Sequence, residues 1–130
     1  MKKTIFICLI ITFISCNAQE KKSIDFENIS VEEFQKMIVK NGSQLIDVRT
    51  PKEYGQGHIK NARLINFFDD NFEKKAFKGL DKNQPVFVYC ASGGRSAKAS
   101  KMYQEAGFKK VYNLLGGFRA WSTKKLEIEK

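Results

Sequence analysis

Cysteine, histidine and proline are scarce in this chain of 130 residues, which has three cysteines, one histidine and two prolines. Three cysteines cannot build the disulfide framework that stabilises many small secreted domains. The histidine, His58, and Cys90 lie too far apart in the sequence to form a zinc-ligand motif. No apolar run reaches the roughly 20 residues that a membrane-spanning helix needs. We therefore expect neither a disulfide scaffold, nor a metal site, nor a spanning helix.

Apolar residues make up 42% of the chain and aromatic residues 12%, which is enough for a packed core. This composition excludes disordered and fibrous proteins, and the length predicts one domain. Basic residues outnumber acidic ones by 23 to 14.

The N-terminus resembles an export signal. Lys2 and Lys3 precede an apolar run from Ile5 to Ile14, which is typical of a signal peptide. The end of this run and the next two residues, Phe13-Ile14-Ser15-Cys16, are similar to the bacterial lipobox. This similarity implies removal of residues 1–15 and lipid attachment to Cys16. We expect an exported lipoprotein, anchored to a membrane and facing the periplasm or the cell surface. A soluble periplasmic protein cut near Ala18 is the alternative.

The remaining chain divides into a polar tether over residues 16–28 and a domain over residues 29–130. Expected strands cover 45–48, 64–66, 85–89 and 111–114; expected helices cover 31–40, 51–54, 70–77, 96–106 and 118–125. Ser30 and Glu33 form a capping box before the first helix, and Asn41-Gly42 ends it. Continuously apolar strands that alternate with helices predict an α/β fold with a mostly parallel sheet covered on both faces.

Residues 90–96, here called the Cys90 loop, carry the strongest chemical signal. They read Cys90-Ala91-Ser92-Gly93-Gly94-Arg95-Ser96 and connect a buried strand to a helix. Two glycines let successive N–H groups converge, and a helix N-terminus adds positive potential, so this loop suits an anion. We expect a lowered pKa for Cys90 and an oxyanion-binding fork from Arg95. The alternative is a structural cysteine followed by a glycine turn.

The Cys90 loop resembles the active-site loop of the rhodanese, or thiosulfate sulfurtransferase, family. Two other stretches resemble the family's N-terminal and C-terminal motifs, in the family's order. The N-terminal stretch consists of Leu45-Ile46-Asp47-Val48-Arg49-Thr50-Pro51, Glu53-Tyr54, Gly57-His58-Ile59 and Ala62. The C-terminal stretch consists of Gly107-Phe108, Val111-Tyr112, Leu114, Gly116-Gly117 and Trp121. The resemblance covers residues 29 to 127. It implies a three-layer, rhodanese-like fold with a central sheet of about five strands.

The resemblance also implies a chemistry. Cys90 would take sulfur from a small anionic donor such as thiosulfate, hold it as a persulfide on the loop, and pass it to a thiol, cyanide or a protein acceptor. No metal or organic cofactor is implied. Ala91 replaces a basic residue of some thiosulfate-using relatives, so a sulfur carrier or redox relay remains open. Four residues separate Cys90 from Arg95, one fewer than in Cys–Arg phosphatases, which disfavours phosphatase or arsenate reductase activity.

Other candidates have more than one interpretation. Asp47 either orients the Cys90 loop or caps the turn at Pro51, and Arg49 is expected to pair with Glu53 four residues later. His58 is either a general base or, as the resemblance implies, a structural residue. Phe67 and Phe68 either line the site or belong to the core.

The C-terminal part is the more basic, because residues 90–130 contain nine basic and three acidic residues. This charge forms a solvated helix face, or it steers anionic donors or contacts anionic lipid. An exported chain without a recognition motif is not expected to bind nucleic acid.

Overall fold

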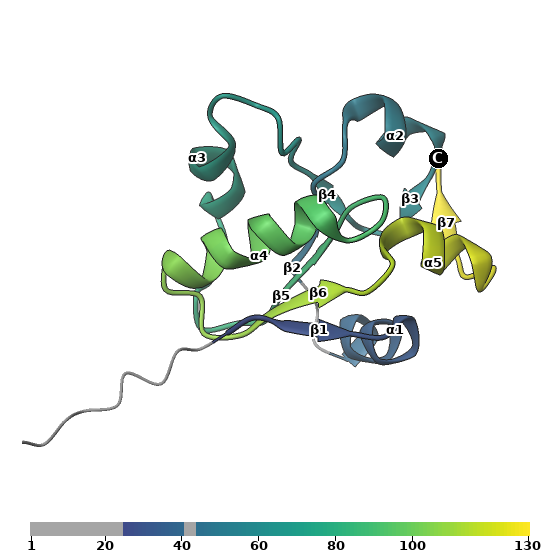
Figure 1. The fold of residues 1–130 in the computed structure, drawn as a ribbon, viewed down its shortest axis with the longest axis horizontal. Coiled ribbons are helices and arrows are strands. Elements are labelled where there is room, and N and C mark those ends of the chain that lie inside the picture. The colour runs from purple at the N-terminus through teal and green to yellow at the C-terminus, as the bar shows by residue number, and fades with distance from the viewer. Residues whose placement is uncertain (1–24, 41–43) are drawn as a thin grey trace, which may run out of the picture.

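The computed structural model describes residues 25–40 and 44–130 (Figure 1). The expected signal peptide, Cys16, most of the expected tether and the Asn41-Gly42 helix end lie outside these residues. Within the described part, no helix is both long and apolar enough to cross a membrane. The same part holds no group of three or more side chains of the types that ligate metals.

A five-stranded parallel sheet forms the centre of the domain, with strand order β1-β6-β5-β2-β4. Its strands are β1 (Glu27–Ile29), β2 (Gln44–Asp47), β4 (Arg63–Leu64), β5 (Val86–Tyr89) and β6 (Val111–Leu114). All four pairings are parallel. Every residue of the central strand β5 is buried, which explains its continuously apolar sequence.

Helices cover both faces of the sheet and complete the three predicted layers (Figure 1). Side chains along β5 alternate between two hydrophobic clusters, because successive strand residues point to opposite faces. Phe87 and Tyr89 pack with α1 (Val31–Lys40) and α5 (Gly117–Thr123). Val86 and Val88 pack with α3 (Phe72–Phe77) and α4 (Gly94–Glu105).

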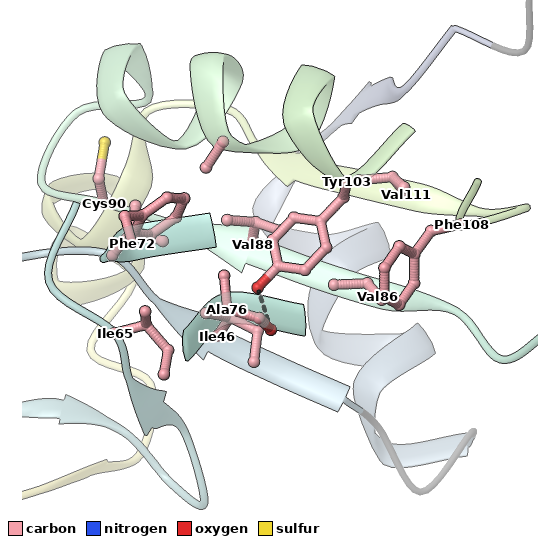
Figure 2. Packing of buried hydrophobic residues seen from close by; sticks show 12 residues of the cluster. Ile46, Ile65, Phe72, Ala76, Val86, Val88, Cys90, Tyr103, Phe108 and Val111 are labelled. Atoms are coloured by element: carbon pink, nitrogen blue, oxygen red, sulfur yellow. Dashed lines mark hydrogen bonds between the residues drawn. The ribbon is translucent and has the colours of Figure 1, made fainter. Parts of the chain in front are cut away.

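Cys90 continues this alternation onto the side of α3 and α4. Figure 2 shows its sulfur at one end of that cluster, beside the start of α4. Farther along, the buried Tyr103 hydroxyl donates a hydrogen bond to the Ala76 carbonyl at 3.1 Å and ties α4 to α3. The end of a buried strand therefore fixes the position of Cys90.

Two features differ from the sequence prediction. The strand β1 begins at Glu27 and pairs with β6, so the last two residues of the expected tether belong to the folded domain. In addition, β3 (His58–Ile59) pairs antiparallel with β7 (Ile128–Glu129), and no strand was predicted at either place. These strands are two or three residues long, which is too short for a periodic pattern to reveal.

Candidate active site

The Cys90 loop connects the carboxyl end of β5 to the N-terminus of α4. It turns at Gly93, whose φ of 108° lies in the left-handed region that favours glycine. Gly94 already belongs to α4, and a Cβ there would meet nothing within 4 Å. The turn therefore needs only the first of the two glycines that the sequence singled out.

Hydrogen-bond donors converge on the Cys90 sulfur. The Gly93 N–H donates to Sγ at 3.1 Å, and the Ser96 hydroxyl lies 3.3 Å from the same atom. Burial of Cys90 opposes ionisation, but hydrogen bonds from the Ser96 hydroxyl and from the N–H groups of Ser96, Ser92 and Gly93 outweigh it. The net effect is a pKa of Cys90 below its usual value, in the direction that the sequence predicted.

The Ser96 hydroxyl makes the largest favourable contribution to the lowered pKa of Cys90, so its removal has a predictable effect. Alkylation by iodoacetamide requires the thiolate, so its rate rises with pH through the pKa and then levels off. We expect a midpoint below the value of about 8.5 for a free cysteine, and a higher midpoint in Ser96→Ala.

The alkylation should be followed by mass spectrometry of the peptide that contains Cys90. Ser92→Ala is the matched control, because Ser92 acts on the sulfur through its backbone N–H, which alanine retains. Equal midpoints for the wild type and Ser96→Ala would contradict the assignment.

The N-terminus of α5 holds the other side of the loop. The N–H groups of Phe118 and Arg119 donate to the carbonyls of Cys90 and Ala91 at 2.8 and 3.0 Å. This close approach depends on Gly117, where a Cβ would lie 2.4 Å from the Cys90 oxygen. Gly117 also has a φ of 57°, in the left-handed region. Another residue there would therefore suffer both a steric clash and an unfavourable backbone conformation.

Asp47 and Arg49 form a buried ion pair at the carboxyl end of β2. The Arg49 guanidinium donates to Asp47 at 2.6 Å and to the Gly57 carbonyl at 2.8 Å. It also lies 4.1 Å from the centre of the Phe118 ring, in the helix that holds the Cys90 loop. The predicted Arg49–Glu53 pair is wrong. The chain bends at Arg49, whose backbone N–H donates to Asp47 at 2.9 Å and so brings the guanidinium onto Asp47, whereas Glu53 lies on α2 (Pro51–Gln56).

The predicted capping role of Asp47 is also wrong, because Thr50 is the N-cap of α2. Asp47 instead accepts hydrogen bonds from the backbone N–H and the side chain of Arg49. Asp47 therefore supports the site indirectly, through Arg49 and Phe118.

The guanidinium of Arg95 is not free to bind an oxyanion, contrary to the sequence prediction. Its two terminal nitrogens donate to the two carboxylate oxygens of Glu53 at 2.9 and 2.8 Å. Hydrogen bonding to Arg95 holds the pKa of Glu53 at about 2, despite the opposing effect of burial. Sequence reasoning missed this partner, although the spacing of Thr50 and Glu53 is that of a capping box and marks the carboxylate as a fixed group.

His58 is placed as a structural residue. Its ring stacks on Tyr54 with centroids 3.7 Å apart, and Nδ1 lies 3.2 Å from the Tyr54 carbonyl. Nε2 lies 3.5 Å from a carboxylate oxygen of Glu129 in β7. These contacts join α2, β3 and β7, and none of them involves the Cys90 sulfur.

The two phenylalanines have different surroundings. Phe67 packs against the cluster that contains Cys90. Phe68 is 66% exposed, and its ring lies 5.5 Å from the Arg95 guanidinium carbon. Phe67 is therefore a half-buried residue that covers the core, and Phe68 is an exposed neighbour of Arg95.

Comparison with known proteins agrees with this arrangement. Residues 30–124 match the family model described as a rhodanese-like domain. The chain belongs to the rhodanese family. The matched residues include the Cys90 loop and every residue of the ion pairs that surround it.

Named relatives of this rhodanese domain include sulfurtransferases. The thiosulfate sulfurtransferase GlpE of Pseudomonas paraeruginosa is 33% identical over 96 residues, which cover 74% of this chain and 84% of that protein. A polysulfide-sulfur transferase homodimer from Wolinella succinogenes is 33% identical, with a TM-score of 0.70 over 82% of this chain and 80% of that one. A rhodanese-like domain protein from Staphylococcus aureus is 31% identical, with a TM-score of 0.68 over 81% of this chain and 100% of that one.

Proposed function

We propose that this protein is a sulfurtransferase that carries sulfane sulfur as a persulfide on Cys90. The observation that carries the proposal is the convergence of the Gly93 N–H and the Ser96 hydroxyl on the Cys90 sulfur, at 3.1 and 3.3 Å. Donors fixed in this way stabilise a thiolate, which is the form that attacks sulfur. They also suit the negative charge of a persulfide at the same place.

The reaction has two halves. In the first, the Cys90 thiolate attacks the outer sulfur of a donor such as thiosulfate; a new S–S bond forms, and sulfite leaves with the electrons of the broken one. In the second, a thiolate or cyanide attacks the outer sulfur of the persulfide and releases the Cys90 thiolate. No net oxidation of the protein occurs, so these steps require no redox cofactor.

Access to the sulfur is restricted in the resting protein. Cys90 is only 1% exposed, so surrounding side chains must move aside before a donor reaches Sγ. The added sulfur extends the group by about 2 Å. The persulfide is therefore easier for an acceptor to reach than the thiol is for a donor.

The names of the relatives support thiosulfate or polysulfide as the donor. A thiol, cyanide or a protein would serve as the acceptor, because each can supply a nucleophile that attacks the outer sulfur. An assay with thiosulfate and cyanide, run beside mass spectrometry of intact protein, tests the proposal. We expect turnover together with a transient mass increase of one sulfur atom on Cys90. A stable adduct without turnover would favour the alternative, a sulfur carrier or redox relay, and the absence of any adduct would reject both.

We also propose that the mature protein is anchored through lipid on Cys16, on the strength of the lipobox-like sequence. In a bacterial host, the wild type is expected in the detergent phase of a partitioning experiment, and Cys16→Ala in the aqueous phase. A wild type that stays in the aqueous phase would contradict the anchor and favour a soluble exported protein.

A further inference from the structure

We propose that Glu53 sets the charge of the sulfur donors that this site accepts: by neutralising Arg95, it disfavours dianionic donors and favours neutral organic hydropersulfides. The inference rests on the proposed sulfurtransferase function and assigns to Glu53 a role in donor specificity.

The Glu53–Arg95 pair occupies the groups that would otherwise bind an anion. Both terminal nitrogens of Arg95 donate to Glu53, one to each carboxylate oxygen. This paired geometry is the one in which a guanidinium would bind an oxyanion. A donor such as thiosulfate therefore meets an ion pair of zero net charge at Arg95.

The carboxylate is held in place from its own helix. Its Oε2 atom also accepts hydrogen bonds from the Thr50 N–H and hydroxyl, both at 2.9 Å. The Glu53 carboxylate is thus held by two partners, the N-cap residue Thr50 of α2 and the Arg95 guanidinium. A carboxylate fixed in this way does not swing aside as a flexible surface side chain would, so displacing it from Arg95 costs an incoming anion several hydrogen bonds.

Arg95 is close enough to matter for the reaction. The charge of Cys90 acts on Arg95 and contributes to raising the pKa of the guanidinium, although hydrogen bonding to Glu53 contributes most. On the outer side, the Phe68 ring lies over the guanidinium. The pair is therefore within electrostatic range of the sulfur, and its guanidinium contacts the exposed Phe68.

With Arg95 paired, the groups that still stabilise charge on the Cys90 sulfur are the N–H groups of the loop and the Ser96 hydroxyl. These donors stabilise a single negative charge on Cys90. A second, dianionic group beside that thiolate meets the Glu53–Arg95 pair, whose cation is already bound to a carboxylate. A neutral hydropersulfide, R–S–SH, avoids this repulsion.

The step with a hydropersulfide balances without a co-reactant. The Cys90 thiolate attacks the terminal sulfur, the S–S bond of the donor breaks, and its electrons leave with the thiolate RS⁻. The proton of the transferred SH group moves to RS⁻. The products are the Cys90 persulfide anion and the thiol RSH.

The test compares two donors in the full-length protein: thiosulfate, and the hydropersulfide of 2-mercaptoethanol generated in situ. The rate of Cys90 persulfide formation is followed by mass spectrometry. In Glu53→Gln, the amide oxygen keeps an acceptor for the Thr50 N–H but removes the charge. We expect kcat/KM for thiosulfate to rise about tenfold, as for one charge-assisted hydrogen bond gained. The hydropersulfide rate should change less than about twofold, since the neutral donor gains no such bond.

Three further variants separate charge from structure. Glu53→Asp keeps the charge but shortens the side chain, so Arg95 is less fully occupied but still faces a carboxylate; the gain for thiosulfate should be smaller than in Glu53→Gln. Adding Arg95→Gln to Glu53→Gln should cancel the gain in kcat/KM for thiosulfate, because the guanidinium that would bind the anion is then absent. Glu73→Gln removes an exposed carboxylate of α3 and controls for net charge.

An unchanged ratio of the two donor rates in Glu53→Gln would overturn the inference, as would an equal gain in Glu53→Asp. A wild type that forms persulfide from neither donor would instead overturn the proposed function, and this inference with it.

Discussion

Replacement of Cys90 by serine is expected to lower sulfur transfer by on the order of a thousandfold or more, as when other enzymes lose a covalent nucleophile. The serine side chain is only slightly smaller than that of cysteine and fits the same buried site, so the fold should persist. Its hydroxyl does not ionise at neutral pH, even with the Gly93 N–H and the Ser96 hydroxyl directed at it. The measurement is the rate of thiocyanate formation from thiosulfate and cyanide.

The best background for this experiment is the full chain with serine at Cys8 and Cys16. In that background Cys90 is the only cysteine, so any persulfide is attributable to it. The background protein should keep its activity, since neither residue belongs to the described domain. Retention of more than a few per cent of activity in Cys90→Ser would reject Cys90 as the sulfur carrier.

Replacement of Gly117 by alanine is expected to have the largest effect on structure. The new Cβ would lie 2.4 Å from the Cys90 oxygen and 2.7 Å from the Ala91 carbonyl carbon. Both are backbone atoms, so the loop and α5 must separate. Together with the positive φ, this predicts a loss of about 2–5 kcal/mol in the free energy of unfolding. Urea denaturation measures the loss, and iodoacetamide titration should show a raised pKa of Cys90.

Gly94→Ala provides a matched control from the Cys90 loop itself. Its Cβ would point into open space, and its backbone is helical. Alanine there should be neutral or should stabilise the protein by up to about 1 kcal/mol, because it restricts the unfolded chain. If Gly117→Ala behaved like Gly94→Ala, the close approach of α5 to the loop would not be essential.

Much of the central fold could be predicted because it depends on local patterns. The apolar runs of β2, β5 and β6 and the capping box before α1 each show in a few consecutive residues. The edge strand β1 and the pair of β3 with β7 could not be predicted in the same way. Each is short, and β3 and β7 exist only because segments 70 residues apart lie side by side.

The candidate site divides along the same line. The sequence by itself singled out Cys90 as the candidate nucleophile, because a cysteine, a glycine turn and a helix start occur together within residues 90–96. It also indicated the direction of the pKa shift, since several donors are backbone N–H groups of the loop, although the largest contribution, from the Ser96 hydroxyl, became apparent only in the structure. Only the tertiary structure decided the pairing of Glu53 with Arg95, across 42 positions. Charged side chains select partners by distance in space, and separate elements, α2 and α4, create that distance. The role of Gly117 also required the structure, because its constraint comes from the carbonyl of Cys90 on the facing loop.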